Sequence, residues 1–339
     1  IPGETDAAPP TGDVLAAVHP LPVETRAVAD ARGMTVRETA RATVDIPVFD
    51  NSAMDGFAVR AADLADLPAR LVVVGESAAT AGPIPSVHPG SAVRVMTGGR
   101  LPPGADAVVP VELTDQPPGA APLPSQVQVR AAVPPGAHLR RAADDLAAGD
   151  LVLRAGELVT PGAIASAAAV GLGALPVAAP VRVAVVATGA ELVDPGSVLA
   201  AGEIPDSNSV MLAALVAAAG ARVVACERSG DDPDRLARLL DGLPAADLIL
   251  TSGGVSAGAY GPVRLLGGDL EFCAVAMQPG KPQGLGRFNG VPLLAFPGNP
   301  VSAFVSFQVF ALPLLDAMAG LRRRSRTRVA RAGVGWAPP

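Results

Sequence analysis

The sequence PGNPVS, residues 297–302, decides the fold of the C-terminal half of this chain. It follows an apolar run at 291–296 and opens another at 303–315, which predicts a strand, a tight glycine turn and a helix. Asn299 suits the N-cap of that helix, and Pro300 suits its first helical position. Backbone N–H groups without partners at such a helix start favour an anion. The stretch therefore predicts an anion site in this half of the chain.

Apolar strands and helical segments alternate from residue 180 onward. Strands are predicted at 181–187, 221–227, 246–251, 272–277 and 291–296. Helices are predicted at 208–219 and from Pro233, with Asp232 as its N-cap, in addition to the one from Pro300. This alternation predicts a mostly parallel α/β sheet that is covered on both faces and binds ligands at the carboxyl ends of its strands.

The first 180 residues have a different organisation. Residues 1–12 are rich in Pro, Gly and Thr and are expected to be loose, and residues 13–42 carry the apolar spacing of a helix. Between 61 and 137, short β-like runs at 71–75, 92–96 and 126–133 are separated by Pro and Gly clusters, which favours a β-rich module. A further helix is predicted at 161–172.

Length and composition narrow the functional classes. The 339 residues, half of them hydrophobic, are enough for several domains with a sizeable core. A net charge of −6 and an aromatic content of 3% argue against a nucleic-acid partner. Each run of eighteen apolar residues is interrupted by a charge, Pro or Gly, so we expect a cytoplasmic protein without a membrane span. Cys226 and Cys273 lie in apolar runs and are expected to be buried free thiols.

Three polar loops each follow a predicted strand of the α/β half. They are Thr188-Gly189-Ala190-Glu191, the loop that contains Ser252, Gly253, Gly254 and Ser256, and the loop Pro297-Gly298-Asn299-Pro300-Val301-Ser302. Each alone is explained by a glycine turn with a hydroxyl that caps the next helix. Together at one sheet edge they favour a phosphate-bearing ligand, because glycine lets backbone N–H groups approach phosphate oxygens. The sequence contains neither GxxxxGK[ST] nor GxGxxG after a strand, so a P-loop and a standard dinucleotide site are unsupported.

Charged side chains provide the remaining candidates. Lys281 is the only lysine of the chain, lies between two prolines, and is a candidate for facing phosphate or an oxyanion. Asp206, Asp231 and Asp232 start predicted helices, where the helix dipole favours carboxylates, and they can also hold Mg²⁺. In the N-terminal half, DNSAMDG at 50–56 holds two carboxylates, for which an Asx-turn is the simpler interpretation.

Taken together, these stretches resemble the molybdopterin molybdenumtransferase family, to which the gephyrin E domain is related. The matching motifs are PVFDNSAMDGFA at 47–58, MTGG at 96–99, PGADAVV at 103–109, TGAEL at 188–192, SGGVSAG at 252–258 and PGNPVS at 297–302. They occur in the family's order and extend over residues 13–325. The DNSAMDG and PGNPVS segments are highly specific as a pair.

The resemblance implies an elongated homodimer of multidomain subunits. A linker and dimer domain would comprise 13–45 and 140–178, with a β-rich domain at 46–139 inserted into it. The α/β molybdopterin-binding domain would span 179–325, and 326–339 would begin a small C-terminal β-barrel that is mostly absent.

The reaction implied by the resemblance inserts molybdate into adenylyl-molybdopterin, releases AMP and uses a divalent ion, usually Mg²⁺. The site would lie between the α/β domain of one subunit and the DNSAMDG region of the other. Asp55 and Thr97 would act from the partner side. The α/β side would contribute Glu191, Asp231 or Asp232, Ser256, Lys281 and the loop at 297–302. Molybdopterin adenylyltransferase is the expected partner in the pathway.

Three positions depart from the family pattern. Gly261 stands where members usually carry an acidic residue, Ala190 replaces an Asp that often precedes Glu191, and Gln278 stands where many members have lysine. These departures leave open an impaired paralogue that binds molybdopterin or a partner protein without turnover. A third interpretation is the adenylyltransferase itself, whose members usually lack an N-terminal half such as the one that carries residues 50–57.

Overall fold

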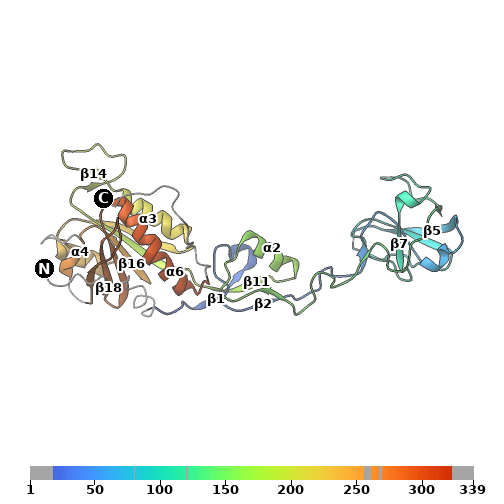
Figure 1. Ribbon diagram of the computed structural model, residues 1–339, viewed down its shortest axis with the longest axis horizontal. Helices are drawn as coiled ribbons and strands as arrows, with labels where there is room; N and C mark the ends of the chain where they lie inside the picture. The colour runs from blue at the N-terminus through green and yellow to red at the C-terminus, as the bar shows by residue number, and fades with distance from the viewer. Residues whose placement is uncertain (1–17, 80, 120, 256–260, 267–268, 323–339) are drawn as a thin grey trace. The chain divides into compact units, whose positions relative to one another are not determined.

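The computed structural model describes residues 18–322, apart from 80, 120, 256–260 and 267–268 (Figure 1). These residues form two compact units. The first contains residues 18–39, 153–164 and 174–322, and the second contains Ala40–Val152 with Ala165–Gly173. Each unit is therefore assembled from segments that are separate in the sequence. The start of the expected β-barrel, 326–339, lies outside the described residues.

The first unit is built on a six-stranded sheet. Its order is β15 (Arg222–Ser229), β12 (Arg182–Thr188), β16 (Leu248–Ser252), β19 (Val291–Phe296), β18 (Pro282–Phe288) and β17 (Glu271–Ala274). The first four strands are parallel, and β18 and β17 extend the sheet in antiparallel pairing. The predicted mostly parallel sheet is confirmed.

Alternation along the central strands gives this sheet two apolar faces. Val183 and Val185 of β12 belong to one core, together with residues of α3 (Ser207–Ala218) and α6 (Leu312–Ala319). Ala184 and Val186 belong to another core, together with residues of α4 (Pro233–Asp241). Successive side chains of a strand point to opposite faces, so both faces acquire helices. Figure 1 shows α3 and α6 on one side of the sheet and α4 on the other.

Side-chain caps determine where two of these helices begin. Asp232 accepts hydrogen bonds from the backbone N–H groups of Asp234 and Arg235, at 2.9 and 3.3 Å. Asn299 Oδ1 accepts from the N–H groups of Val301 and Ser302, at 3.0 and 3.1 Å, at the start of α5 (Pro300–Ser306). A cap of this kind satisfies donors that have no partner inside the helix. Both predicted helix starts are confirmed.

The C-terminal helical run passes from α5 through a π-helical turn, Phe307–Ala311, into α6. Among the described residues, this run over Pro300–Ala319 has the length and apolar composition that crossing a membrane requires, with a mean hydropathy of 1.6. Phe307, Phe310 and Leu314 are buried against the sheet, whereas Val301 and Phe304 are exposed. The structure therefore uses it as a core helix of the first unit.

Short pairings join the segments that precede the sheet. Strand β1 (Val23–Ala27) pairs antiparallel with β11 (Ala174–Ala178), β2 (Ala40–Arg41) pairs with β10 (Leu151–Leu153), and α2 covers Pro161–Ala169, as predicted. The helix expected over 13–42 is wrong for the described residues 18–42, which form β1, a 3-10 turn (Val28–Asp30) and β2. Val36 is fully buried and bridges Val177, so pairing with a distant segment overrides the local spacing.

The second unit is built on a five-stranded sheet. Its order is β7 (Ala107–Pro110), β4 (Gly56–Val59), β6 (Ser91–Val95), β5 (Ala69–Ser77) and β8 (Gln126–Val129). Strands β5 and β6 are parallel and the other pairs are antiparallel. Phe57, Leu71 and Val109 lie in its core. A two-residue strand β3 (Asn51–Ser52) pairs with β9 (Leu139–Arg140). The predicted β-rich character of this region is confirmed, and its finer division into domains stays a prediction.

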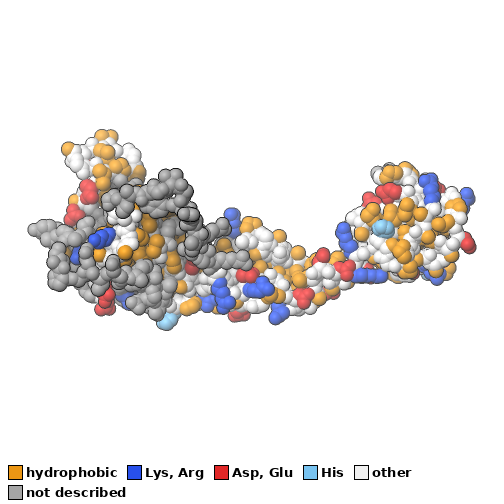
Figure 2. Space-filling model, viewed as in Figure 1, with side chains coloured by type: hydrophobic (Ala, Val, Ile, Leu, Met, Phe, Trp, Pro, Cys, Tyr) orange, Lys and Arg blue, Asp and Glu red, His pale blue; other side chains and the backbone are white. Residues whose placement is uncertain are grey.

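Surface features test two further expectations. Both cysteines are free, as predicted, but Cys226 is exposed and Cys273 is only half-buried. The prediction of burial fails because both lie on the outermost strands of the sheet, β15 and β17. On the face drawn in Figure 2, acidic and basic side chains of described residues are interspersed. The absence of a nucleic-acid partner stays a prediction.

Candidate functional site

The three glycine-containing loops follow β12, β16 and β19, which are adjacent in the sheet. These strands are parallel, and the register places Ala187 opposite Ser252 and Ser252 opposite Phe296. Their carboxyl ends therefore lie at one edge, where open α/β sheets bind ligands. The expectation that the three loops share an edge is confirmed.

Close backbone contacts hold the loops together. The Gly253 N–H donates to the Phe296 carbonyl at 3.0 Å, and the Thr188 hydroxyl donates to the Ser252 carbonyl at 3.4 Å. Gly253 has a φ of +92°, and a Cβ at this position would overlap the Thr188 carbonyl oxygen. A Cβ at Gly298 would lie 3.5 Å from the Gly253 Cα. Glycine at 253 is therefore required for the loops to approach each other.

Lys281 lies at the same edge of the sheet. It directly precedes β18, which runs antiparallel to β19 and places Gly284 opposite Ala295. Strand β18 therefore begins where β19 ends. The Lys281 carbonyl accepts a hydrogen bond from Val275 at 2.8 Å, and the residue is exposed. A lysine at this position adds a positive charge beside the helix start at Asn299.

Asn208 is a residue of this edge that the sequence reasoning missed. It lies in the first turn of α3, and its Nδ2 donates to Ser252 Oγ at 2.7 Å and to the Gly298 carbonyl at 2.8 Å. One amide nitrogen thus joins the second loop to the third. The available signal was the polar run Asp206-Ser207-Asn208-Ser209 at a helix start.

Buried polar atoms without a hydrogen-bond partner also gather here. Within the part of the chain that the structure describes they are Asn208 Oδ1, Ser209 Oγ, Arg228 Nη1, Ser229 Oγ, Thr251 Oγ1 and Gln283 Oε1. They lie at the last residues of β15 and β16, the start of α3 and the start of β18. Because buried polar groups normally have partners, this concentration at one edge is typical of a site that binds water or ligand.

Two carboxylates flank the first loop. Asp231 accepts a hydrogen bond from the Ala190 N–H at 3.4 Å. The Glu191 carboxylate folds over Gly189, where a Cβ would lie 2.6 Å from Glu191 Oε2. Both carboxylates are exposed. Each therefore lies beside a residue of the first loop, and carboxylates are ligands that Mg²⁺ takes together with substrate phosphates.

The other predicted metal ligands have structural partners. Asp206 is buried and caps α3 by accepting from the Ser209 N–H at 3.0 Å, and Asp232 caps α4. Over residues 18–322 with the gaps named above, the structure contains no group of three His, Cys, Asp or Glu side chains placed to hold a metal. Glu191 and Asp231 are therefore the predicted acidic residues of this edge that do not cap a helix.

Several further predicted residues are placed as follows. Ser256 lies outside the described residues. Pro297 and Ser302 are buried, and the Ser302 hydroxyl donates to Asn299 Oδ1 at 3.5 Å. A Cβ at Gly261 would overlap the Gly254 carbonyl oxygen. The acidic side chain that the family pattern suggests at 261 therefore does not fit this backbone.

Asp55 and Thr97 form a direct contact in the second unit. Asp55 Oδ1 accepts from the Thr97 backbone N–H at 2.7 Å and from its hydroxyl at 2.8 Å. The backbone N–H first, and then the hydroxyl, lower the pKa of Asp55 below its usual value. Asp55 also lines a cavity of about 260 Å³, together with Phe57, Met96 and Gln116. The contact presents an ionised carboxylate beside a partly apolar hollow.

The other carboxylate of the DNSAMDG segment has a structural role. Asp50 accepts from the Ala142 N–H at 2.8 Å and from Arg141 Nη1 at 2.6 Å. These bonds lower the pKa of Asp50, the Ala142 N–H contributing most. Asp50 therefore joins the DNSAMDG segment, which contains β3, to the residues that follow β9. Neither carboxylate forms the Asx-turn that was the simpler interpretation, because the backbone partners of Asp50 and Asp55 lie 92 and 42 residues away in the sequence.

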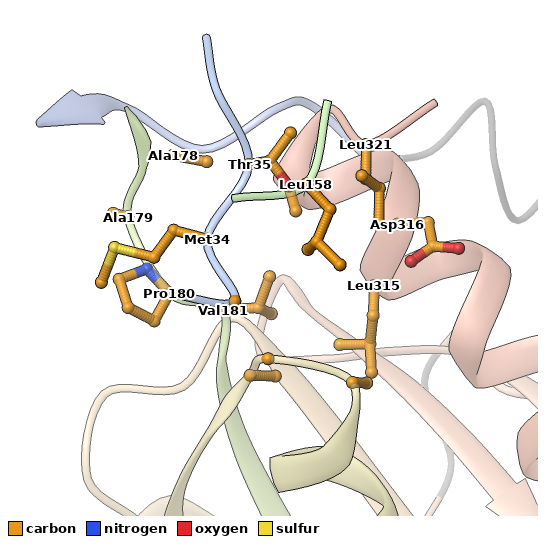
Figure 3. A pocket seen from close by; sticks show the side chains of 15 residues that line it. Met34, Thr35, Leu158, Ala178, Ala179, Pro180, Val181, Leu315, Asp316 and Leu321 are labelled. Atoms are coloured by element: carbon orange, nitrogen blue, oxygen red, sulfur yellow. The ribbon is translucent and has the colours of Figure 1, made fainter. Parts of the chain in front are cut away.

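A small pocket at the opposite edge is not the site. It measures about 20 Å³ and lies beside Val181, which precedes β12 and marks the amino end of that strand. Figure 3 shows Leu158, Val181 and Leu315 lining it from three segments. Its volume is that of a water molecule, so a nucleotide-like ligand does not fit.

Comparisons with known proteins match this architecture. The MoeA N-terminal region (domain I and II) matches residues 10–171, and a probable molybdopterin binding domain matches residues 184–317. Molybdopterin molybdenumtransferase 2 of Mycobacterium tuberculosis is 46% identical over 323 residues, which cover 91% of this chain and 78% of the relative. The chain belongs to the molybdopterin molybdenumtransferase family.

Other members of this family agree. The molybdopterin molybdenumtransferase of Bacillus subtilis is 33% identical, over 86% of this chain and 69% of its own length. The crystal structure of the molybdopterin biosynthesis MoeA protein from Pyrococcus horikoshii superposes with a TM-score of 0.76 at 28% identity, over 92% of this chain and 79% of that one. The chain is thus a transferase of molybdenum cofactor biosynthesis, and the resemblance inferred from its motifs is confirmed.

Proposed function

We propose that the chain inserts molybdate into adenylyl-molybdopterin and releases AMP. The observation that carries this proposal is the carboxyl edge of the first unit's sheet, where three glycine loops, the α5 helix start and Lys281 lie together. Such an edge suits a ligand that carries phosphates. Adenylyl-molybdopterin is a ligand of this class, because its molybdopterin and AMP moieties are joined through phosphate.

Water adds across that linkage, leaving one phosphate on molybdopterin and one on AMP, so negative charge develops on the departing AMP phosphate. The Lys281 ammonium would stabilise this charge as it develops, together with loop N–H groups other than those of Gly189, Ala190, Gly253, Val301 and Ser302, which donate to protein acceptors. Glu191 and Asp231 would hold Mg²⁺ through their carboxylates, and the ion would add positive charge at the phosphates. The two dithiolene thiols of molybdopterin then bind the molybdenum, and one oxygen of molybdate leaves with their protons as water.

Asp55 and Thr97 are proposed to act on the same substrate from a second subunit. The support is the pairing of the two side chains, which keeps an ionised carboxylate exposed in a segment that is specific for the family. We therefore propose a homodimer in which the Asp55 region of one subunit completes the site of the other. A cytoplasmic location and a pathway partner that adenylylates molybdopterin stay predictions.

Neither alternative is favoured. The relatives named molybdopterin molybdenumtransferase match most of the chain, which disfavours a paralogue that only binds. The match to the MoeA N-terminal region over residues 10–171 disfavours the adenylyltransferase, whose members usually lack that half. The glycine at 261 is explained by close backbone packing against Gly254.

The test is AMP release by purified protein given adenylyl-molybdopterin, Mg²⁺ and molybdate, measured by chromatography. We expect Lys281→Ala to lower kcat/KM by about 10²-fold, the usual effect of removing a group that stabilises developing charge. Arg287→Ala is the matched control, because Arg287 lies towards the other end of β18 and donates to the Gly290 carbonyl at 2.7 Å. No AMP release by the wild-type chain, under conditions in which the Mycobacterium tuberculosis relative is active, would refute the proposal.

A further inference from the structure

We propose that Asn208 is a positioning residue that sets the spacing of two substrate-binding loops. These are the Ser252 loop, residues 252–254, and the Gly298 loop, residues 297–299. The inference rests on the proposed function in one respect, because it assumes that both loops hold the phosphates of the substrate. Its structural part, that one amide holds both loops, is independent of which ligand binds there.

The orientation of the Asn208 amide follows from its partners. The Gly298 carbonyl only accepts hydrogen bonds, so the group 2.8 Å from it must be the donor Nδ2 and not Oδ1. The same nitrogen donates its second hydrogen to Ser252 Oγ at 2.7 Å. Both hydrogens of one rigid amide are thus used, one on each loop. A change in the distance between the loops would break one of the two bonds.

The backbone of Asn208 is firmly held. Asp206, itself buried, caps α3 through the Ser209 N–H at 3.0 Å, and Leu212 and Val216 of the same helix are fully buried against the sheet. The loops, in contrast, contain Gly253, Gly254 and Gly298, which have no side chains with which to anchor themselves. The rigid helix α3 therefore supports the two loops through Asn208. The loops themselves need glycine, because a side chain there would keep phosphate from approaching the backbone.

The remaining atom of the amide points to the same conclusion. Asn208 Oδ1 is buried and has no hydrogen-bond partner within the described residues. A group that served only to stabilise the fold would be expected to have both polar atoms satisfied. This oxygen lies beside the two loops and can accept a hydrogen bond from a water molecule or from a donor group of the substrate.

Two variants and one control test this proposal. Asn208→Ala removes the amide, and Asn208→Asp keeps its size but places an acceptor against the Gly298 carbonyl. We expect each to lower kcat/KM for AMP release at least tenfold, with Asn208→Asp no better than Asn208→Ala. The control is Asn289→Gly, which removes an amide that donates to Asp241 at 2.7 Å in the turn between β18 and β19. The replacement by glycine tolerates the positive φ of 48° at this position.

Amide hydrogen exchange of the ligand-free protein separates positioning from a general loss of stability. Asn208→Ala should accelerate exchange in peptides containing 252–254 and 297–299 together, with the core strands unchanged, and Asn289→Gly should accelerate neither loop. A double-mutant cycle adds a second criterion, because Asn208→Ala and Ser252→Ala should have less than multiplicative effects on kcat/KM. Asn208→Asp provides the same exchange readout if the alanine variant does not fold.

Unchanged exchange in both loops, or fully multiplicative effects in the cycle, would overturn the inference. If the wild-type protein releases no AMP, the proposed function fails while the exchange experiment still decides whether Asn208 holds the loops. If AMP release is normal and Asn208→Ala alters neither exchange nor kcat/KM, the positioning role fails and the proposed function stands.

Discussion

At the scale of single residues, the molecule distinguishes two carboxylates that lie five positions apart. Asp50 accepts hydrogen bonds from Arg141 and Ala142, whereas Asp55 accepts hydrogen bonds from Thr97 and remains exposed. Both have lowered pKa values, so both are ionised near neutral pH. Their hydrogen-bond partners distinguish the two roles: Asp50 stabilises the local fold, and the exposed Asp55 can contact a substrate.

The Asp55–Thr97 contact gives a prediction about pH. Thr97→Val removes the hydroxyl but keeps the backbone N–H, so the pKa of Asp55 should rise towards its usual value and still remain below it. Because the folded pKa is lowered, this contact stabilises the fold above the unfolded pKa of 3.8, and the contribution is lost as pH falls through the folded value. In Thr97→Val this contribution should be smaller, and its loss, which still begins near the unfolded pKa of 3.8, should be complete at a higher pH. A ¹³C carboxyl titration measures the shift, and Thr25→Val is the control. An unchanged Asp55 titration in Thr97→Val would contradict the assignment.

At the scale of elements, variants of the adjacent residues Asp231 and Asp232 distinguish metal binding from helix capping. Asp232→Ala removes the α4 cap and should cost about 1 kcal/mol of unfolding free energy, without altering the Mg²⁺ requirement. Asp231→Ala removes no cap, so it should change stability by less than about 0.5 kcal/mol and raise the Mg²⁺ concentration needed for half-maximal AMP release. Denaturant titration and a Mg²⁺ titration measure the two effects, and the reverse pattern would reassign the roles.

Loop geometry gives a second prediction at this scale. Gly253 and Gly196 have nearly the same φ, +92° and +89°, but a Cβ at Gly196 meets nothing within 4 Å. Gly196→Ala should therefore cost only the left-handed backbone strain of about 1–2 kcal/mol. Gly253→Ala should add about 1–3 kcal/mol, because its Cβ overlaps the Thr188 carbonyl, and should also abolish AMP release. Equal stability of the two variants in denaturant would show that the loops are not closely packed.

At the scale of the whole molecule, the proposed homodimer predicts complementation between impaired chains. Lys281→Ala alone should retain only about 1% of wild-type activity, as above, and Asp55→Asn alone should be similarly impaired. Mixed dimers would contain one intact site, built from the wild-type Asp55 of one chain and the wild-type Lys281 of the other. Random mixing should restore about one quarter of wild-type AMP release, since half of the dimers are mixed and each has one of two sites. Light scattering should give twice the 33.8 kDa of the chain. A site contained within one chain predicts no recovery.

Much of this protein is determined by its sequence alone. Glycine turns, Asn299 and Asp232 caps and the alternation of strands and helices are local features, so the α/β order and the helix starts were predictable. The motifs identified the family for the same reason, because each is a short run of particular residues at fixed spacing. Tertiary structure alone decided the rest. Strand order placed Lys281 beside the loops, and distant pairing replaced the described part, 18–42, of the helix expected over 13–42. Asn208 acquired its partners Ser252 and Gly298 across 44 and 90 residues. Such contacts depend on which segments the folded chain brings together, and local spacing does not encode that.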